Sequence, residues 1–161
     1  MKNKNVAFMT QAAMIAAIYV VLTYVFAPFS FGEVQIRISE ALTILPIFTP
    51  AAVPGLLVGC LIGNILGGAI LPDIIFGSIA TLLGAALTYK LRDTKPWIAA
   101  LPPVVTNAII VPFVLRFGYG VTLPIPLMMC TVGIGEIVSC EVLGLVLYYA
   151  LRKYSKTVFA V

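Results

Sequence analysis

Long apolar runs with very few charges constrain the fold of this chain more than any other feature. The run 6–27 contains no charged residue, and a helix needs about 20 apolar residues to cross the hydrocarbon core of a bilayer. Only 10% of the 161 residues are charged, and the mean hydropathy is +1.11. Because soluble domains are usually about 25% charged, we expect lipid to be the solvent for most of this chain.

The apolar runs predict an all-α membrane protein with six transmembrane helices in a single integral membrane domain. The expected helices cover residues 6–27, 40–51, 54–71, 73–91, 101–117 and 125–151. Pro46, Pro50 and Pro54 make the second and third helices short, so one of the two could be re-entrant. Ser39 is expected to cap the second helix and Asp73 the fourth.

The basic residues predict the orientation of these helices. If six spans alternate from a cytoplasmic N-terminus, eight of the ten Lys and Arg residues lie inside, and only Arg37 and Arg116 lie outside. Cytoplasmic loops are enriched in Lys and Arg, so both termini are expected in the cytoplasm, with 6–27 retained as the first helix. Residues 29–39 alternate polar and apolar side chains, which predicts an extended outer loop over a cavity.

A few charged and amide side chains are expected within or at the ends of the spans. An ionised side chain inside a span costs about 2.5–3.5 kcal/mol on insertion scales, so such residues are candidates for function. The candidate substrate-binding residues are Glu136, Asn107, Arg37, Glu40, Asn64 and Arg116.

Glu136 and Glu141 lie in the same predicted helix, but their spacing separates them by about 500° around its axis. They should therefore face different directions, and Glu136 is the better ligand candidate. The alternative is that Glu136 forms an internal ion pair with Arg37 or Arg116.

Two patterns of small residues predict close helix packing. A glycine stripe recurs at four-residue intervals in the third helix and is expected to pack inside the protein; it consists of Gly55, Gly59, Gly63 and Gly67. Two alanine pairs in the first helix could pack internally or dock another membrane protein; they are Ala12, Ala13, Ala16 and Ala17.

Several residue types and motifs are missing from the sequence. The chain has no histidine, and its three cysteines have no CxxC spacing, so neither a metal site nor a disulfide framework is expected. It also lacks a GxxxxGK[ST] motif for ATP. We therefore expect a protein without enzyme activity or cofactors, and a solute binder of this kind needs a partner that supplies energy.

Five segments taken in order through nearly the whole chain, 34–46, 53–64, 73–84, 101–111 and 133–136, resemble the QueT-type S components of energy-coupling factor (ECF) transporters. The resemblance implies uptake of a queuosine precursor, a 7-deazaguanine such as preQ0, preQ1 or queuine, across the bacterial cell membrane. It implies an outward-opening site under the first outer loop, and assembly with a T component and two ABC ATPase subunits. In such a complex the alanine pairs would dock the T component.

With such a ligand, we expect Glu136 to accept from the donor edge of the base and Asn107 to make a second polar contact, with Arg37 and Glu40 at the lid. Three other interpretations remain open. The chain could be an S component for another vitamin-like heterocycle. It could be a small channel or scaffold built on the glycine stripe, or an intramembrane enzyme that uses Glu136 or Glu141.

Overall fold

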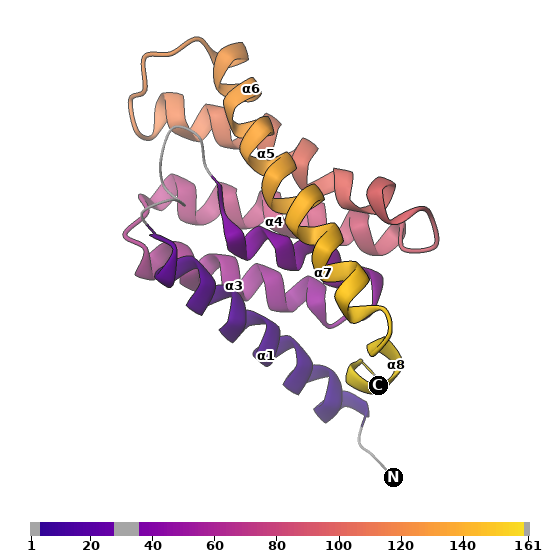
Figure 1. Ribbon diagram of the computed structural model, residues 1–161. Coiled ribbons are helices and arrows are strands. Elements are labelled where there is room, and N and C mark those ends of the chain that lie inside the picture. Colours follow the sequence, from indigo (N-terminus) through magenta and orange to yellow (C-terminus); the bar gives the residue numbers. More distant parts are fainter. Residues whose placement is uncertain (1–3, 28–35, 160–161) are drawn as a thin grey trace.

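The computed structural model describes residues 4–27 and 36–159, and within these ranges the chain is helical with no strand (Figure 1). The first half contains α1 (Lys4–Val25), the 3-10 helix η1 (Ile38–Ile47), α3 (Ala52–Leu66) and α4 (Leu71–Lys90). The second half contains α5 (Pro96–Phe117), α6 (Ile125–Glu136), the π-helical segment η2 (Ile137–Leu143), α7 (Gly144–Leu151) and the short α8 (Ser155–Val158). The expected extended segment 29–39 falls mostly outside the described residues.

Four helical runs are long and apolar enough to cross a membrane: α1, α4, α5, and the continuous run Ile125–Leu151 formed by α6, η2 and α7. The chain is therefore a membrane protein with several candidate spans, and the prediction of an all-α fold is confirmed for the described residues. Two further apolar helices, η1 with 10 residues and α3 with 15, are shorter.

The second helix differs from the prediction of an α-helix over 40–51. It begins at Ile38 and is a 3-10 helix that contains Pro46. A proline has no amide hydrogen to donate and disfavours a continuous α-helix. The 3-10 form rises about 2.0 Å per residue instead of about 1.5 Å, so these ten residues cover more depth than an α-helix would.

Neither predicted cap forms. Arg37 occupies the N-cap position of η1, and Ser39 lies inside the helix, where its hydroxyl accepts a hydrogen bond from Thr23 Oγ1 at 2.8 Å. Ile70 occupies the N-cap position of α4, and Asp73 lies in the first turn. Both side chains have tertiary partners, described below, and these partners take the place of the local cap.

Three glycines of the stripe, Gly55, Gly59 and Gly63, are buried against α1 as predicted, whereas Gly67 is half-buried and lies just past the end of α3. A Cβ added to Gly55 would lie 2.7 Å from the carbonyl oxygen of Ala12, and one added to Gly63 would lie 3.2 Å from Thr23 Oγ1. Because the residue numbers on α1 and α3 rise together along the contact, the two helices run parallel. The close approach depends on glycine, since any side chain would push the helices apart.

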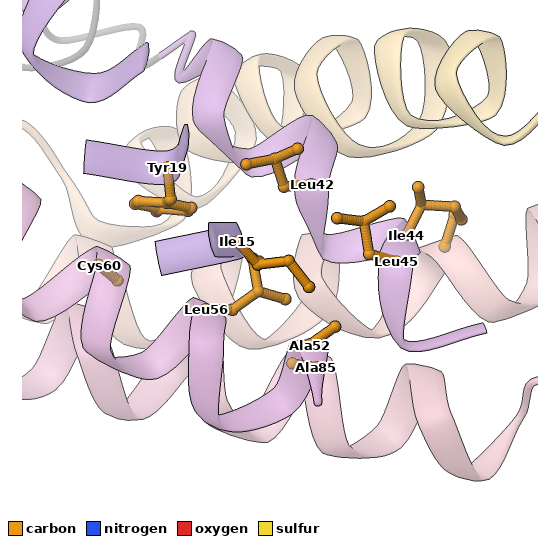
Figure 2. Close-up of a cluster of buried hydrophobic side chains, with 10 residues drawn as sticks. Ile15, Tyr19, Leu42, Ile44, Leu45, Ala52, Leu56, Cys60 and Ala85 are labelled. Carbon is orange, nitrogen blue, oxygen red and sulfur yellow. The ribbon is translucent and has the colours of Figure 1, made fainter. Parts of the chain in front are cut away.

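The apolar core lies between α1, η1, α3 and α4, with a contribution from α5. Figure 2 shows most of its side chains converging from these elements; the cluster comprises Ile15, Tyr19, Leu42, Ile44, Leu45, Ala52, Leu56, Cys60, Ala85 and Ala100. A smaller cluster joins α5 to α6 through Val111, Leu115, Met128 and Val132. The two clusters fix the helices that carry the polar side chains of the interior.

The beginning and the end of the chain lie at the same end of the molecule (Figure 1). Gln11 Nε2 on α1 donates to the carbonyl oxygen of Val158 on α8 at 3.5 Å. Thr49, just after η1, donates to Gln11 Oε1 at 2.9 Å, whereas Ser39 near the start of η1 contacts Thr23. Hence η1 runs antiparallel to α1, and its first residues lie toward the opposite end, away from the termini.

Candidate substrate-binding site

Glu40 lies in the interior of the protein rather than at an outer lid, where it was predicted. It is 1% exposed, and its Oε1 accepts hydrogen bonds from the Tyr19 hydroxyl and from Thr81 Oγ1 at 3.3 Å. Its Oε2 is buried and has no hydrogen-bond partner among the described residues. The placement follows from η1, which packs against α1 and α4 and directs this residue inward.

Glu136 meets Glu40 from the other side of the bundle. It is the last residue of α6 and is 1% exposed. Its Oε2 accepts from the Cys140 thiol at 3.2 Å, and the buried Asn107 side chain lies close enough to interact with its carboxylate. One oxygen of Glu40, one of Glu136 and the Cys140 sulfur all lie within 4.8 Å of one another. The structure therefore brings together three residues predicted to bind substrate: Glu136, Asn107 and Glu40.

The helix that carries Glu136 changes its hydrogen-bond register at this point. The π-helical segment η2 begins at Ile137, directly after Glu136. Ser139 Oγ donates to the carbonyl oxygen of Gly135 at 2.9 Å across the junction. Single π turns inside α-helices occur often at functional sites, and this one holds Cys140 against Glu136.

A second polar group lies nearer the end of the bundle opposite the termini. Arg37 Nη2 is 3.7 Å from Asp73 Oδ2, and both side chains are buried. The Tyr119 hydroxyl, from the loop between α5 and α6, donates to the same carboxylate oxygen at 3.0 Å. Asn64 Nδ2 donates to the backbone carbonyl of Asp73 at 3.4 Å. These contacts link η1, α3, α4 and the 118–124 loop close to the carboxyl pair.

Tyr119 is the titratable member of this group that lies outside the membrane-spanning segments. Partial burial raises the pKa of its hydroxyl, and the neighbouring Asp73 carboxylate raises this pKa further. The phenol therefore stays protonated at physiological pH, so it can donate its hydrogen to the Asp73 carboxylate there.

Arg116 and Glu141 lie apart from these groups. Arg116 is exposed, and its Nη1 donates to the backbone carbonyl of Val121 at 3.1 Å. Glu141 is half-buried, and its Oε1 has no partner among the described residues. Glu40, rather than Glu141, is the carboxyl group that clusters with Glu136, and the prediction that Glu136 and Glu141 face different directions stays a prediction.

Three residues of the site were not predicted: Tyr19, Thr81 and Cys140. Cys140 follows Glu136 by four residues, which places both on one helix face, so this spacing was a usable signal. Tyr19 carries no comparable signal, because Tyr24 on the same helix is exposed. Thr81 carries none either, because Ser78 and Thr88 on α4 are buried as well without contacting the carboxyl pair.

The alanine pairs of α1 divide between two faces. Ala12 and Ala16 face α3, where Ala16 is buried, while Ala13 and Ala17 are exposed. A groove of about 300 Å³ between α1 and α3 adjoins them. One pair thus packs internally, and docking through the other remains a prediction.

Comparison with known proteins agrees with these features. The family model described as QueT transporter matches residues 9–153. The queuosine precursor transporter QueT of Lactococcus lactis subsp. cremoris (strain MG1363) is 30% identical over 95 residues, which is 58% of this chain and 56% of the relative. The match thus spans little more than half the length of that relative, and no solved structure matches this chain. Since the family model covers most of the sequence, the chain belongs to the QueT transporter family.

Proposed function

We propose that this chain is the substrate-binding S component of an ECF-type ABC importer and binds a queuosine precursor of the 7-deazaguanine class. The observation that carries the proposal is the buried group of Glu40, Glu136 and Asn107 inside an apolar helical bundle. Buried carboxyl groups in a membrane protein are costly and mark ligand sites more often than structural ones. The name of the Lactococcus relative supplies the class of ligand.

The chemistry of a 7-deazaguanine suits these side chains. Its ring N–H and exocyclic NH₂ form a donor edge that one carboxylate can accept as a pair of charge-assisted hydrogen bonds. We assign this contact to Glu136, and the Asn107 amide next to it offers a donor for the ring carbonyl. Arg37 and Asn64, which both contact Asp73, are proposed to line the polar side of the site. The exposed Arg116 is proposed to lie at the edge of the site.

In the proposed complex this chain crosses the membrane six times and has both termini in the cytoplasm. The contact between α1 and α8 at one end of the bundle supports an even number of passages. Basic residues in the α4–α5 loop and near the C-terminus support a cytoplasmic location for that end. The chain has no P-loop motif, so ATP hydrolysis falls to two partner ATPases, which a transmembrane T component couples to this chain.

The T component docks on the exposed face of α1 that contains Ala13 and Ala17. Ala17→Trp adds bulk to this face and should reduce co-purification of the T component without changing ligand affinity. Ile109→Trp is a matched control, because Ile109 is equally exposed on α5, away from α1. Equal co-purification of the T component with both variants would exclude this docking face.

Mass spectrometry of small molecules retained by the detergent-purified chain tests the proposed ligand. We expect a 7-deazaguanine at up to one molecule per wild-type chain, and much less in Glu136→Gln purified in the same way. Recovery of flavin or thiamin alone would contradict the proposed ligand class and favour an S component for another vitamin-like heterocycle.

A further inference from the structure

The interior of the bundle holds more carboxyl groups than cations. From this imbalance we infer that the ligand carries an ammonium group, which Glu40 binds while Glu136 binds the ring. The inference rests on the proposed function and narrows it to amine-bearing 7-deazaguanines, as opposed to the uncharged nitrile compound. It also gives the two neighbouring carboxylates separate roles.

Among the described residues, buried carboxyl groups outnumber buried cations whichever carboxylate Arg37 is paired with. Among the described residues, the buried ionisable Asp, Glu, Lys and Arg side chains are Arg37, Glu40, Asp73 and Glu136. Arg37 lies 3.7 Å from Asp73. Even if its charge were credited to another carboxylate, three carboxyl groups would share one guanidinium. An ionised carboxylate that is buried without a cation is strongly unfavourable, so a positive group on the ligand would relieve the site.

The hydrogen bonds show where that positive group belongs. Glu136 already has Cys140 and Asn107 as partners. Glu40 has both of its donors on Oε1, and its buried Oε2 has no partner in the described part of the chain. A ligand gains most binding free energy when it donates a hydrogen bond to a buried oxygen that has no other donor. We therefore assign the ammonium to Glu40 Oε2.

An ammonium suits this position better than a metal ion does. The three candidate ligand atoms come from Glu40, Glu136 and Cys140, whereas calcium takes about six to eight oxygen ligands and structural zinc about four ligands. An ammonium offers three donors, so it can bind Glu40 Oε2 without the additional ligands that a metal ion needs. A nitrile has no hydrogen to donate and would face these oxygens with its own lone pair.

Titration calorimetry of the full-length chain in detergent, at neutral pH with EDTA present, tests the inference. Three ligands share the 7-deazaguanine ring: the aminomethyl compound, its neutral hydroxymethyl isostere and the nitrile compound. We expect the aminomethyl compound to bind about 10- to 100-fold more tightly than either neutral compound, as for a charge-assisted hydrogen bond in place of a neutral one.

Two variants locate the effect. Glu40→Gln should lower the affinity for the aminomethyl compound at least about 10-fold more than it lowers the affinity for either neutral compound. Glu141→Gln, on the same chain but outside the site, should leave all three affinities unchanged. If Glu40→Gln fails to fold, the comparison of the three ligands on the wild-type chain still decides the question.

Several results would overturn the inference. One is equal binding of the nitrile and aminomethyl compounds by the wild-type chain, which would leave the proposed function intact. Another is an equal loss for all three ligands in Glu40→Gln. Aminomethyl binding that needs a divalent cation and disappears with EDTA would assign the carboxylates to a metal instead. Failure of all three compounds to bind would overturn both the inference and the proposed function.

Discussion

At the scale of single residues, the site depends on side chains that hydrogen-bond to one oxygen of the Glu40 carboxylate and leave the other oxygen available to a ligand. Tyr19 and Thr81 both donate to Glu40 Oε1, which fixes the orientation of Oε2 before a ligand arrives. Preorganisation of this kind lowers the entropy that binding has to overcome.

Tyr19→Phe removes one of these donors and keeps the aromatic ring in the core. We expect the affinity for an amine-bearing 7-deazaguanine to fall about 10-fold, measured by titration calorimetry. Tyr24→Phe is the matched control, because Tyr24 lies on the same helix and is 65% exposed. If both variants bound the ligand equally, the contact between Tyr19 and Glu40 would have no role in binding.

Asp73 supports the structure around the site. Asp73→Asn removes the charge opposite Arg37 and leaves the guanidinium buried without its carboxylate. Loss of one partner of a buried pair typically costs about 3–5 kcal/mol, so we expect a clear drop in the thermal unfolding midpoint. Asp93→Asn breaks the exposed pair of Arg92 and Asp93, whose carboxylate is 89% exposed, and should leave the midpoint unchanged. Equal midpoints in the two variants would contradict a structural role for Asp73.

The sequence predicted some of these residues and missed the contacts between them. The rule that intramembrane polar groups are functional selects Glu136 and Asn107 correctly as members of one buried group. It also selects Glu40, but the depth of Glu40 depends on where η1 begins and on which side it packs. Hydropathy does not encode that packing. For the same reason Tyr19 and Thr81, which carry no charge, could not be distinguished from ordinary core residues.

At the scale of elements, apolar length and small-residue spacing were sufficient for the long helices and for the glycine stripe. The 3-10 form of η1 and the π-helical form of η2 were not predicted. Both forms depend on the register of the backbone hydrogen bonds, which is set by tertiary packing. The length of an apolar run does not indicate this register. The 3-10 helix η1 carries Glu40, and the π-helical segment η2 begins directly after Glu136. The two elements that were hardest to predict therefore position the carboxyl pair.

The contact between α1 and α3 can be tested at one glycine. A Cβ on Gly59 would lie 2.8 Å from Tyr19 Cβ, closer than real side chains approach, whereas one on Gly133 would lie 3.8 Å from Ala108 Cβ. Gly59→Ala should destabilise the protein by about 1–3 kcal/mol, as overpacking does, and Gly133→Ala should be nearly neutral. Thermal unfolding in detergent measures both. A Gly59→Ala variant as stable as Gly133→Ala would show that the helices do not pack this closely.

At the scale of the whole molecule, the apolar bundle encloses a polar interior at intermediate depth. Glu40 and Glu136 come from opposite halves of the sequence and meet between α1, α4 and α5. The Arg37–Asp73 pair lies between this site and the end of the bundle opposite the termini. This arrangement suits capture of a small polar solute from one side of a membrane.

The most direct test of this account is an equilibrium titration of the detergent-purified chain with an amine-bearing 7-deazaguanine. Wild-type protein and Glu136→Gln would be compared, with thermal unfolding in the same buffer to show that both are folded. The account predicts one ligand per wild-type chain and an affinity at least about 10-fold lower in Glu136→Gln. Equal affinities in the two folded proteins would contradict the assignment of the buried carboxyl pair as the binding site.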